Sequence, residues 1–272
     1  MKSIRLPWHF YRQYPADYSA GAQAARGFHG WTSVVRELDL SRTALLLMHL
    51  PDAGLTPDTE WRPDCQRPDL HGTVEWIPRT MELNTQRLPP LVTTARQAGL
   101  QVVHVRSRID DWLQPQAARS LAEAGPAPVA DTDRIEADSQ HDQDVFGPMP
   151  DRPPGSPEHF IGLPDELRTH GTDLVVTQSW QLHRLMKNRG ITHLIYTGWA
   201  LNWCLWFSPG GMGDMARKGY RCSAVRGGCV AIENRESAAT EGNLAYAEWQ
   251  TSTMFGYLFE VAELTGALAR SH

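Results

Sequence analysis

Short apolar runs that alternate with helix-forming stretches constrain the fold of this chain more than any other feature. The runs lie at 43–50, 101–105, 173–177, 192–197 and 220–225. The stretches between them, such as LVTTARQAG and LHRLMKNRG, combine helix formers with a basic last turn and a closing glycine. Strands that are apolar throughout are typical of a parallel sheet with helices on both faces. The alternation predicts a Rossmann-type α/β protein with three α/β/α layers and a mostly parallel sheet of five or six strands.

The two ends of the chain do not follow the alternation. Residues 1–40 are rich in aromatic side chains, which predicts an N-terminal arm that wraps around the domain or around a partner subunit. Residues 241–268 have the length and apolar recurrence of one long helix, or of two helices broken near Gly256.

Residues 41–268 are expected to form a single domain with two long loops, at 52–79 and 107–165. Proline, glycine and aspartate are frequent in both loops. Each loop follows the carboxyl end of a predicted strand, where α/β sheets bind their ligands. We therefore expect the loops to wall a site for a small-molecule substrate.

The composition excludes several classes of partner. The chain has 41% hydrophobic and 21% charged residues, a formal net charge of -5 and no basic run, which argues against a nucleic-acid partner. Its first residues lack the continuous apolar core of a signal peptide, and no later stretch is apolar for the roughly 18 residues that a membrane span needs. We therefore expect a cytoplasmic protein with no membrane partner.

Four cysteines offer possible thiol chemistry: Cys65, Cys204, Cys222 and Cys229. Neither a CxxC pair nor the His and Cys spacing of a structural zinc site is present, so we expect free thiols and neither a metal nor another cofactor. Cys222 and Cys229 lie in or just after a predicted strand and are interpreted as core residues. Cys65 lies in the polar stretch WRPDCQRPD and is expected to be exposed.

Cys204 occupies a position that suits a nucleophile. It follows a predicted strand and the turn at Gly198, near the start of a predicted helix. The unpaired backbone donors of a helix start favour the thiolate, and they also stabilise the oxyanion that forms when a thiolate attacks a carbonyl group. The alternative is a core cysteine, because free cysteine is among the most buried residue types.

Four segments follow one another in this order: TALLLMHLPD, ARQAGLQVVHVRS, LMKNRGITHLIYTGWALNWC and MARKGYRCSAV. In sequence and spacing they resemble the isochorismatase-like cysteine hydrolase family over residues 43–225. In that family the first strand ends in an acidic residue, a lysine follows a later strand, and a G-x-x-x-x-x-C turn supplies the nucleophile. Gly198 and Cys204 match this turn. The resemblance implies the family fold, a nucleophilic Cys204 and a homo-oligomer, either a dimer or a tetramer.

The chain departs from the family pattern at two catalytic positions. His49 stands where the family has its acidic residue, and Thr177 and Gln178 lead directly into the helix at 179–189 without a lysine. A Cys and His pair serves as nucleophile and base in other hydrolases. We therefore expect His49, or Asp52 three residues later, to relay protons, with Gln178 or Asp52 orienting the His49 ring. The alternatives are a hydrogen-bonded structural histidine and a surface aspartate in a turn.

Other residues near this edge are candidates for holding a substrate. The resemblance implies a cis peptide bond between Trp199 and Ala200, whose backbone helps to shape the oxyanion site. Arg106 follows the second strand and is placed to meet a polar substrate. Trp203, Trp206 and Phe207 flank Cys204, and we expect two of these three rings to pack under the helix and one to wall the site.

Family members that are nicotinamidases bind zinc through an aspartate and two histidines after the first strand. The corresponding region offers candidate ligands without that spacing: His49, Asp52, Asp58, Asp64, Asp69 and His71. The prediction is therefore no metal.

Three functional hypotheses follow. The first is a cysteine hydrolase that cleaves a small amide or another C–N bond through a Cys204 thioester. The second is a catalytically silent relative that binds a small molecule or forms an oligomer. The third is a reaction that does not use the thiol as a nucleophile.

Overall fold

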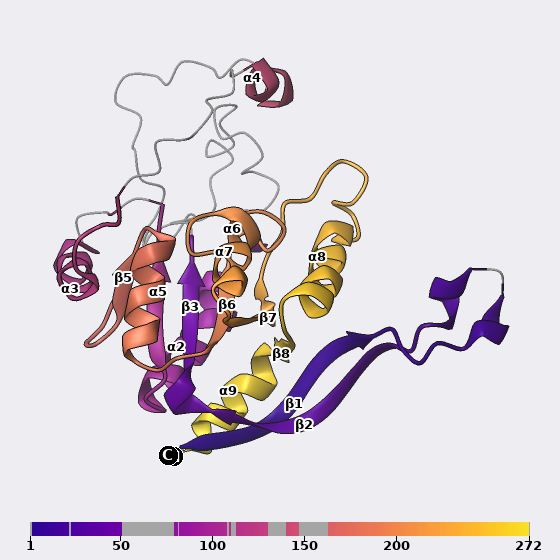
Figure 1. Ribbon diagram of the computed structural model, residues 1–272, viewed down its shortest axis with the longest axis horizontal. Helices are drawn as coiled ribbons and strands as arrows, with labels where there is room; N and C mark the ends of the chain where they lie inside the picture. The colour runs from indigo at the N-terminus through magenta and orange to yellow at the C-terminus, as the bar shows by residue number, and fades with distance from the viewer. Residues whose placement is uncertain are drawn as a thin grey trace.

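The computed structural model describes residues 2–21, 23–50, 79–80, 82–107, 109, 113–129, 140–146 and 163–271 (Figure 1). Its strands are β1 (Ser3–Arg12), β2 (Gly30–Asp39), β3 (Thr43–Met48), β4 (Gln101–Val105), β5 (Leu174–Val176), β6 (His193–Gly198), β7 (Arg221–Cys229) and β8 (Leu258–Glu260). Its α-helices are α2 (Leu88–Gln97), α3 (Gln114–Ala124), α4 (Gln140–Phe146), α5 (Ser179–Asn188), α6 (Cys204–Phe207), α7 (Met212–Arg217), α8 (Gly242–Met254) and α9 (Val261–Ala269). A π-helical segment, η5 (Leu83–Arg87), leads into α2. None of the helices in the described ranges has the length and apolar character to cross a membrane.

The strands of the described chain form one sheet of eight, in the order β2-β1-β8-β7-β6-β3-β4-β5. Strands β3 to β8 pair in parallel with one another, and β1 is antiparallel to both β2 and β8. The predicted α/β class and mostly parallel sheet are confirmed. The prediction of five or six strands is wrong, because an N-terminal hairpin adds two strands beyond the six parallel ones.

The hairpin β1–β2 extends away from the body of the molecule (Figure 1). Near its base, Ile4, Leu6 and Trp8 alternate with more exposed residues and are buried in the core, as in a strand with one face against the core. The hairpin joins the rest of the sheet through one residue pair, His9 with Leu258. Pro7 obscured this strand in the sequence, because proline cannot donate to a ladder and lowers the strand signal.

Strand side chains alternate between two apolar cores, one on each face of the sheet. On one face α2 and α9 cover residues such as Leu45 and Ile195. On the other face α5, α6, α7 and α8 cover residues such as Leu46 and Tyr196. The predicted three layers are therefore present.

The C-terminal stretch contains a strand that the helix prediction for 241–268 missed. Strand β8 separates α8 from α9 and runs parallel to β7. The break falls at Gly256, where a Cβ atom would lie 2.5 Å from the carbonyl oxygen of Cys222 and 2.8 Å from the Ser223 hydroxyl. Only glycine lets the chain pass so close to β7, and this tertiary contact overrides the helical pattern.

Candidate active site

The carboxyl ends of neighbouring parallel strands bring predicted site residues to one edge of the sheet. Met48, which ends β3, lies opposite Val105 of β4 and opposite Gly198 of β6. The ladder continues past the strand ends: the His49 N–H donates to the Val105 carbonyl at 2.9 Å, and the Trp199 N–H donates to the Met48 carbonyl at 3.1 Å. His49 and Trp199 therefore follow adjacent strands at the same edge.

Gly198 allows the turn after β6 to approach β3. Its φ angle is +116°, and a Cβ atom at this position would lie 2.1 Å from the Met48 carbonyl oxygen. No other residue fits both the conformation and the space. The glycine that the sequence analysis placed in the turn is thus required by packing.

The turn that leads to Cys204 is held by the segment after β7. The Val230 N–H donates to the Gly198 carbonyl at 3.1 Å, and the Leu201 N–H donates to the Val230 carbonyl at 2.8 Å. Val230 thereby holds both ends of a turn that contains the Trp199–Ala200 peptide bond. That bond is cis, as the resemblance predicted.

Asn202 adds a contact that the sequence analysis missed. Its side-chain amide donates to the Ile232 carbonyl at 2.9 Å and accepts from the Ile232 N–H at 3.0 Å. Glu233, which follows Ile232 in the chain, accepts the Asn243 and Leu244 N–H groups at the start of α8, each at 2.9 Å. The turn, the 230–233 segment and α8 are therefore linked by hydrogen bonds. Such pairing depends on the fold, and no local motif marks Asn202.

Cys204 is the first residue of α6 and is partly buried. The Ala200 carbonyl accepts the N–H groups of Trp203 at 3.1 Å and Leu205 at 3.0 Å. Within the described chain, no hydrogen bond engages the backbone N–H of Ala200 or of Cys204. These two N–H groups are therefore candidates to stabilise an oxyanion.

His49 differs from the expected base in its ionisation. Burial, with the Arg106 charge in support, lowers the pKa of His49 to about 4. The ring is therefore a neutral imidazole at neutral pH. Its backbone lies in the left-handed region, with φ +50°, which is uncommon for a residue with a side chain. Both side chains are described, and no hydrogen bond joins the His49 ring to the Cys204 thiol.

Arg106 lies beside His49 at the end of β4. Its N–H donates to the Val176 carbonyl of β5 at 2.9 Å, and its Nη1 donates to the Leu50 carbonyl at 2.6 Å. The guanidinium group is thereby tied to the segment that carries His49. It supplies positive charge at this edge of the sheet.

Gln178 lies two strands away from β3, at the N-cap of α5, and its side chain is exposed. Its backbone N–H donates to the Gln181 side chain at 3.1 Å. Because neighbouring strands lie about 4.8 Å apart, the end of β5 is roughly 10 Å from the end of β3. No hydrogen bond joins Gln178 to His49 among the residues that the structure describes.

A polar network beside Gln178 was not anticipated. The Ser179 hydroxyl donates to Asp214 of α7 at 2.5 Å and accepts the Gly210 N–H at 2.7 Å. The Tyr196 hydroxyl donates to the Gly210 carbonyl at 2.9 Å. These bonds fix the loop between α6 and α7 against the start of α5. The polar residues come from three distant segments, so sequence spacing cannot reveal the network.

Of the three aromatic rings around Cys204, fewer are buried than predicted. Trp206 is buried and its Nε1 donates to the Thr251 hydroxyl at 3.1 Å. Trp203 is 45% exposed and Phe207 is 77% exposed. One ring packs under the helix instead of two, because α6 has a single turn and only one of its faces meets the core. Trp203 and Phe207 remain open to solvent beside the thiol.

Several predicted residues lie outside the described residues. They are Asp52, Asp58, Cys65, Asp64, Asp69 and His71, together with most of the loops 52–79 and 107–165. In the described ranges, no group of three or more His, Cys, Asp or Glu side chains is arranged to hold a metal ion. Cys222 and Cys229 are buried, as predicted, and burial raises the pKa of each thiol to about 12.

No family model and no curated protein matches this sequence. Solved structures do match it. A cysteine hydrolase from Pseudomonas syringae pv. phaseolicola superimposes with a TM-score of 0.51 at 14% identity, over 86% of this chain and 96% of that one. An isochorismatase family protein from Burkholderia thailandensis matches with a TM-score of 0.43 at 18% identity, over 84% and 96% of the two chains. For N-carbamoylsarcosine amidase from Thermoplasma acidophilum the TM-score is 0.40 and the identity 13%, over 82% and 98%.

The chain has an isochorismatase-like fold. This agrees with the resemblance found in the sequence, and at 14% identity the similarity to the Pseudomonas hydrolase establishes the fold alone.

Proposed function

We propose that this protein is a cysteine hydrolase that cleaves an amide or another C–N bond in a small molecule, with Cys204 as the nucleophile. The observation that carries the proposal is the position of Cys204 at the start of α6, where no hydrogen bond within the described chain engages the N–H groups of Ala200 and Cys204. Acyl transfer by a thiol needs backbone donors of this kind to stabilise the oxyanion. His49 follows the adjacent strand at the same edge of the sheet.

The proposed reaction has two steps. In the first, the Cys204 thiol loses its proton, its sulfur bonds to the carbonyl carbon, and the C–N bond breaks as the nitrogen takes up a proton. In the second, water attacks the thioester, which releases the acid and restores the thiol. His49 or Asp52 relays the proton in each step. The neutral His49 ring has a nitrogen that can accept the proton.

Trp203 and Arg106 are the proposed substrate contacts. The exposed Trp203 ring offers an apolar wall next to Cys204, and the Arg106 guanidinium favours a polar or anionic group. Orienting the His49 ring stays the proposed role of Gln178 or Asp52. By analogy with the family resemblance, the active form is a cytoplasmic homo-oligomer.

Release of ammonia or amine from a panel of small amides and ureides tests the proposal. The Cys204→Ala variant should lose at least about a thousandfold in kcat, while circular dichroism and thermal unfolding stay close to wild type. Cys222→Ala is the matched control, because it removes a thiol from the core and not from the site. Turnover that persists in Cys204→Ala would overturn the nucleophile assignment and favour a reaction that does not use the thiol.

A silent binding protein is the second candidate, and two observations favour it. His49 replaces the acid of the family pattern, and Gln178 caps α5 where that pattern has a lysine. If no amide or ureide is turned over while ligands still bind the native protein, this second function replaces the first. A Cys204-dependent rate on any of these substrates would exclude it.

A further inference from the structure

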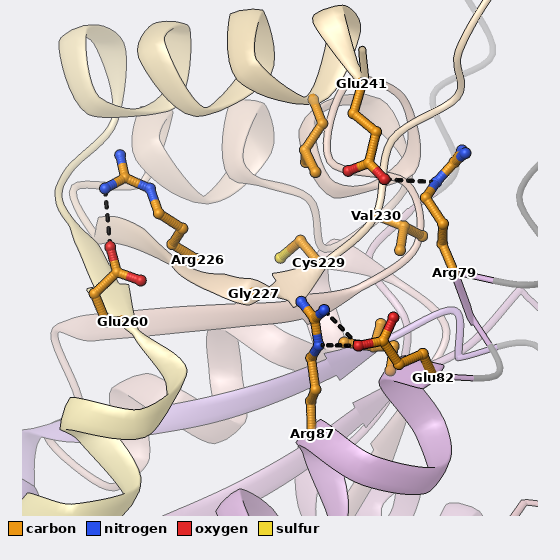
Figure 2. A pocket seen from close by; sticks show the side chains of 11 residues that line it. Arg79, Glu82, Arg87, Arg226, Gly227, Cys229, Val230, Glu241 and Glu260 are labelled. Carbon is orange, nitrogen blue, oxygen red and sulfur yellow. Dashed lines mark hydrogen bonds and ion pairs between the residues drawn. The ribbon is translucent and has the colours of Figure 1, made fainter. Parts of the chain in front are cut away.

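A charged pocket of about 260 Å³ lies at the carboxyl end of β7, apart from Cys204 and His49. Its lining comes from three distant segments of the chain, shown together in Figure 2. They are residues 79–87 before α2, the end of β7 with the residues after it, and the segment from α8 to β8. The volume is below the roughly 300 Å³ at which pockets for drug-sized molecules begin, so it suits a molecule of amino-acid size.

The charges on this pocket balance. Three arginines and three glutamates line it: Arg79, Arg87, Arg226, Glu82, Glu241 and Glu260. Figure 2 shows them as three ion pairs around a centre formed by Gly227 and Cys229. A balanced set of charges does not favour a ligand with a net charge of either sign, because like charges repel it on one side.

Polar atoms on both sides of the pocket remain unused. Arg87 donates to Glu82 through Nε at 3.1 Å and Nη2 at 2.6 Å, and within the described chain its Nη1 has no acceptor. Glu260 accepts from Arg226 through Oε1 at 2.9 Å, and in the same ranges its Oε2 has no donor. Among the described residues, the Glu241 carboxylate pairs only with Arg79, at 3.9 Å, which is too long for a hydrogen bond. The Nη1 donor of Arg87 and the carboxylates of Glu241 and Glu260 are thus available to a ligand.

Glycine leaves the space in which a ligand would lie. A Cβ atom on Gly227 would be 3.5 Å from Arg87 Nη1 and 3.2 Å from a Val261 methyl group. Because Gly227 has no side chain, the space between its backbone and Arg87 Nη1 stays open. The rest of the lining is apolar and comes from Leu83, Leu244 and Val230. Apolar surroundings strengthen hydrogen bonds to charged partners.

We infer that this pocket binds a small zwitterion, a molecule of amino-acid size with one carboxylate and one ammonium group. The carboxylate accepts from Arg87 Nη1, and the ammonium group donates to Glu241 and Glu260. This site is additional to the proposed active site, and its lining includes neither Cys204 nor His49. Val230 lies in the lining and also holds the turn before Cys204, so the two sites share one structural element.

Calorimetric titration of the full-length protein with L-alanine, L-serine and L-glutamine, each with one carboxylate and one ammonium group, tests the inference. At least one of them should bind, and its N-acetyl derivative and its α-carboxamide should each bind at least roughly tenfold more weakly, because each lacks one of the two charges. If none of them binds at millimolar concentration, the inference is wrong. Equal affinity for the acetylated form would also overturn it, because the ammonium group would then have no role.

Two variants assign the charges to their partners. Arg87→Gln should weaken binding of the amino acid roughly tenfold and leave the affinity for the α-carboxamide little changed. Glu241→Gln should also weaken binding of the amino acid roughly tenfold and leave the affinity for the N-acetyl form little changed. Both side chains are nearly half exposed, so unfolding temperatures should stay near wild type. Glu123→Gln, at an ion pair elsewhere on the surface, is the matched control. Binding unchanged in both variants would place the ligand elsewhere and contradict the inference.

Cys204→Ala separates this inference from the proposed function. Amino-acid binding should be the same in that variant as in wild type, whatever happens to hydrolysis. Loss of binding with Cys204→Ala would place the amino acid in the active site and refute a separate pocket.

Discussion

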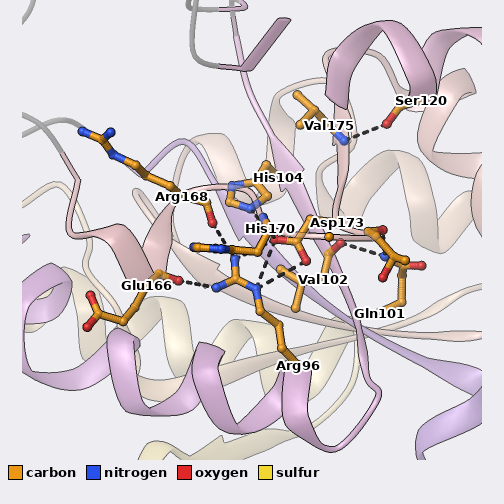
Figure 3. Close-up of polar contacts among 12 residues, drawn as sticks. Arg96, Gln101, Val102, His104, Ser120, Glu166, Arg168, His170, Asp173 and Val175 are labelled. Atoms are coloured by element: carbon orange, nitrogen blue, oxygen red, sulfur yellow. Dashed lines mark hydrogen bonds and ion pairs between the residues drawn. The ribbon is translucent and has the colours of Figure 1, made fainter. Parts of the chain in front are cut away.

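Asp173 holds a buried polar cluster at the amino end of β5, and replacing it with asparagine should destabilise the fold strongly. Its carboxylate accepts from Arg96 Nη2 at 2.6 Å and Nε at 3.2 Å, and from the His170 N–H at 3.1 Å (Figure 3). The ring Nε2 of His104, itself buried, lies 3.3 Å from the same carboxylate. Arg96 also donates to the Glu166 and Arg168 carbonyls, so the cluster ties α2 to the segment before β5.

The size of the effect follows from burial. The Asp173 side chain is 4% exposed and that of Arg96 is 18% exposed. Removing one partner of a buried ion pair typically costs about 3–5 kcal/mol, because the other charge is left uncompensated. Arg96 keeps its carbonyl acceptors and some solvent, so Asp173→Asn should cost about 3 kcal/mol, near the lower end. For a chain of this size that corresponds to a fall in Tm of roughly 6–12 °C.

Urea titration and thermal unfolding of Asp173→Asn measure this loss, with Glu123→Gln as the control. Glu123 pairs with Arg189 at the surface, where its side chain is 43% exposed, and such a pair contributes at most about 1 kcal/mol. A loss for Asp173→Asn no larger than that of the control would refute the reasoning. Hydrolytic activity should survive at temperatures where the variant is folded, because the cluster lies at the amino end of the sheet and Cys204 at the carboxyl end.

Three further predictions follow. Burial lowers the pKa of His193 to about 3 and of His49 to about 4, so below about pH 6.5 the unfolded chain binds protons that the folded protein does not. The free energy of unfolding from urea titrations should therefore fall steadily from pH 6.5 towards pH 3. A flat profile would contradict these pKa values. Gly198→Ala should lower that free energy by at least about 2 kcal/mol, because its Cβ would collide with the Met48 carbonyl. Gly171→Ala, at a positive φ in open space, should cost only about 1 kcal/mol, and equal losses would refute the steric argument. Light scattering after size exclusion should give a dimer or tetramer, and a monomer at every concentration would refute the predicted homo-oligomer.

The sequence was sufficient to predict features that depend on local pattern. The run 101–105 coincides with β4, and the runs 43–50 and 192–197 contain or nearly match β3 and β6. Strands that are apolar on both faces and alternate with helices bury those faces in a parallel sheet with helices on both sides. The glycine turn before Cys204 was also visible, because a glycine after an apolar strand marks a sharp change of direction.

Features that depend on contacts between distant segments were not predictable. Gly256 marked a possible break in the C-terminal helical stretch, but its close approach to β7, and the strand β8 that follows, depend on a distant segment. The low pKa of His49 comes from burial and from Arg106, 57 positions away in the chain, so its ionisation could not be read from local sequence. The charged pocket joins residues from 79 to 260 and has no motif. The choice between His49 and Asp52 as proton relay stays a prediction.

Selective alkylation tests the central claim, that Cys204 carries the chemistry. The protein would be treated with iodoacetamide, and the remaining hydrolytic activity would be compared with the alkylated fraction of each cysteine by peptide mass spectrometry. Cys222 and Cys229 are buried and should react slowly, and Cys65→Ser removes the remaining thiol. We expect activity to fall in direct proportion to Cys204 alkylation. Activity that persists when Cys204 is fully alkylated would contradict it.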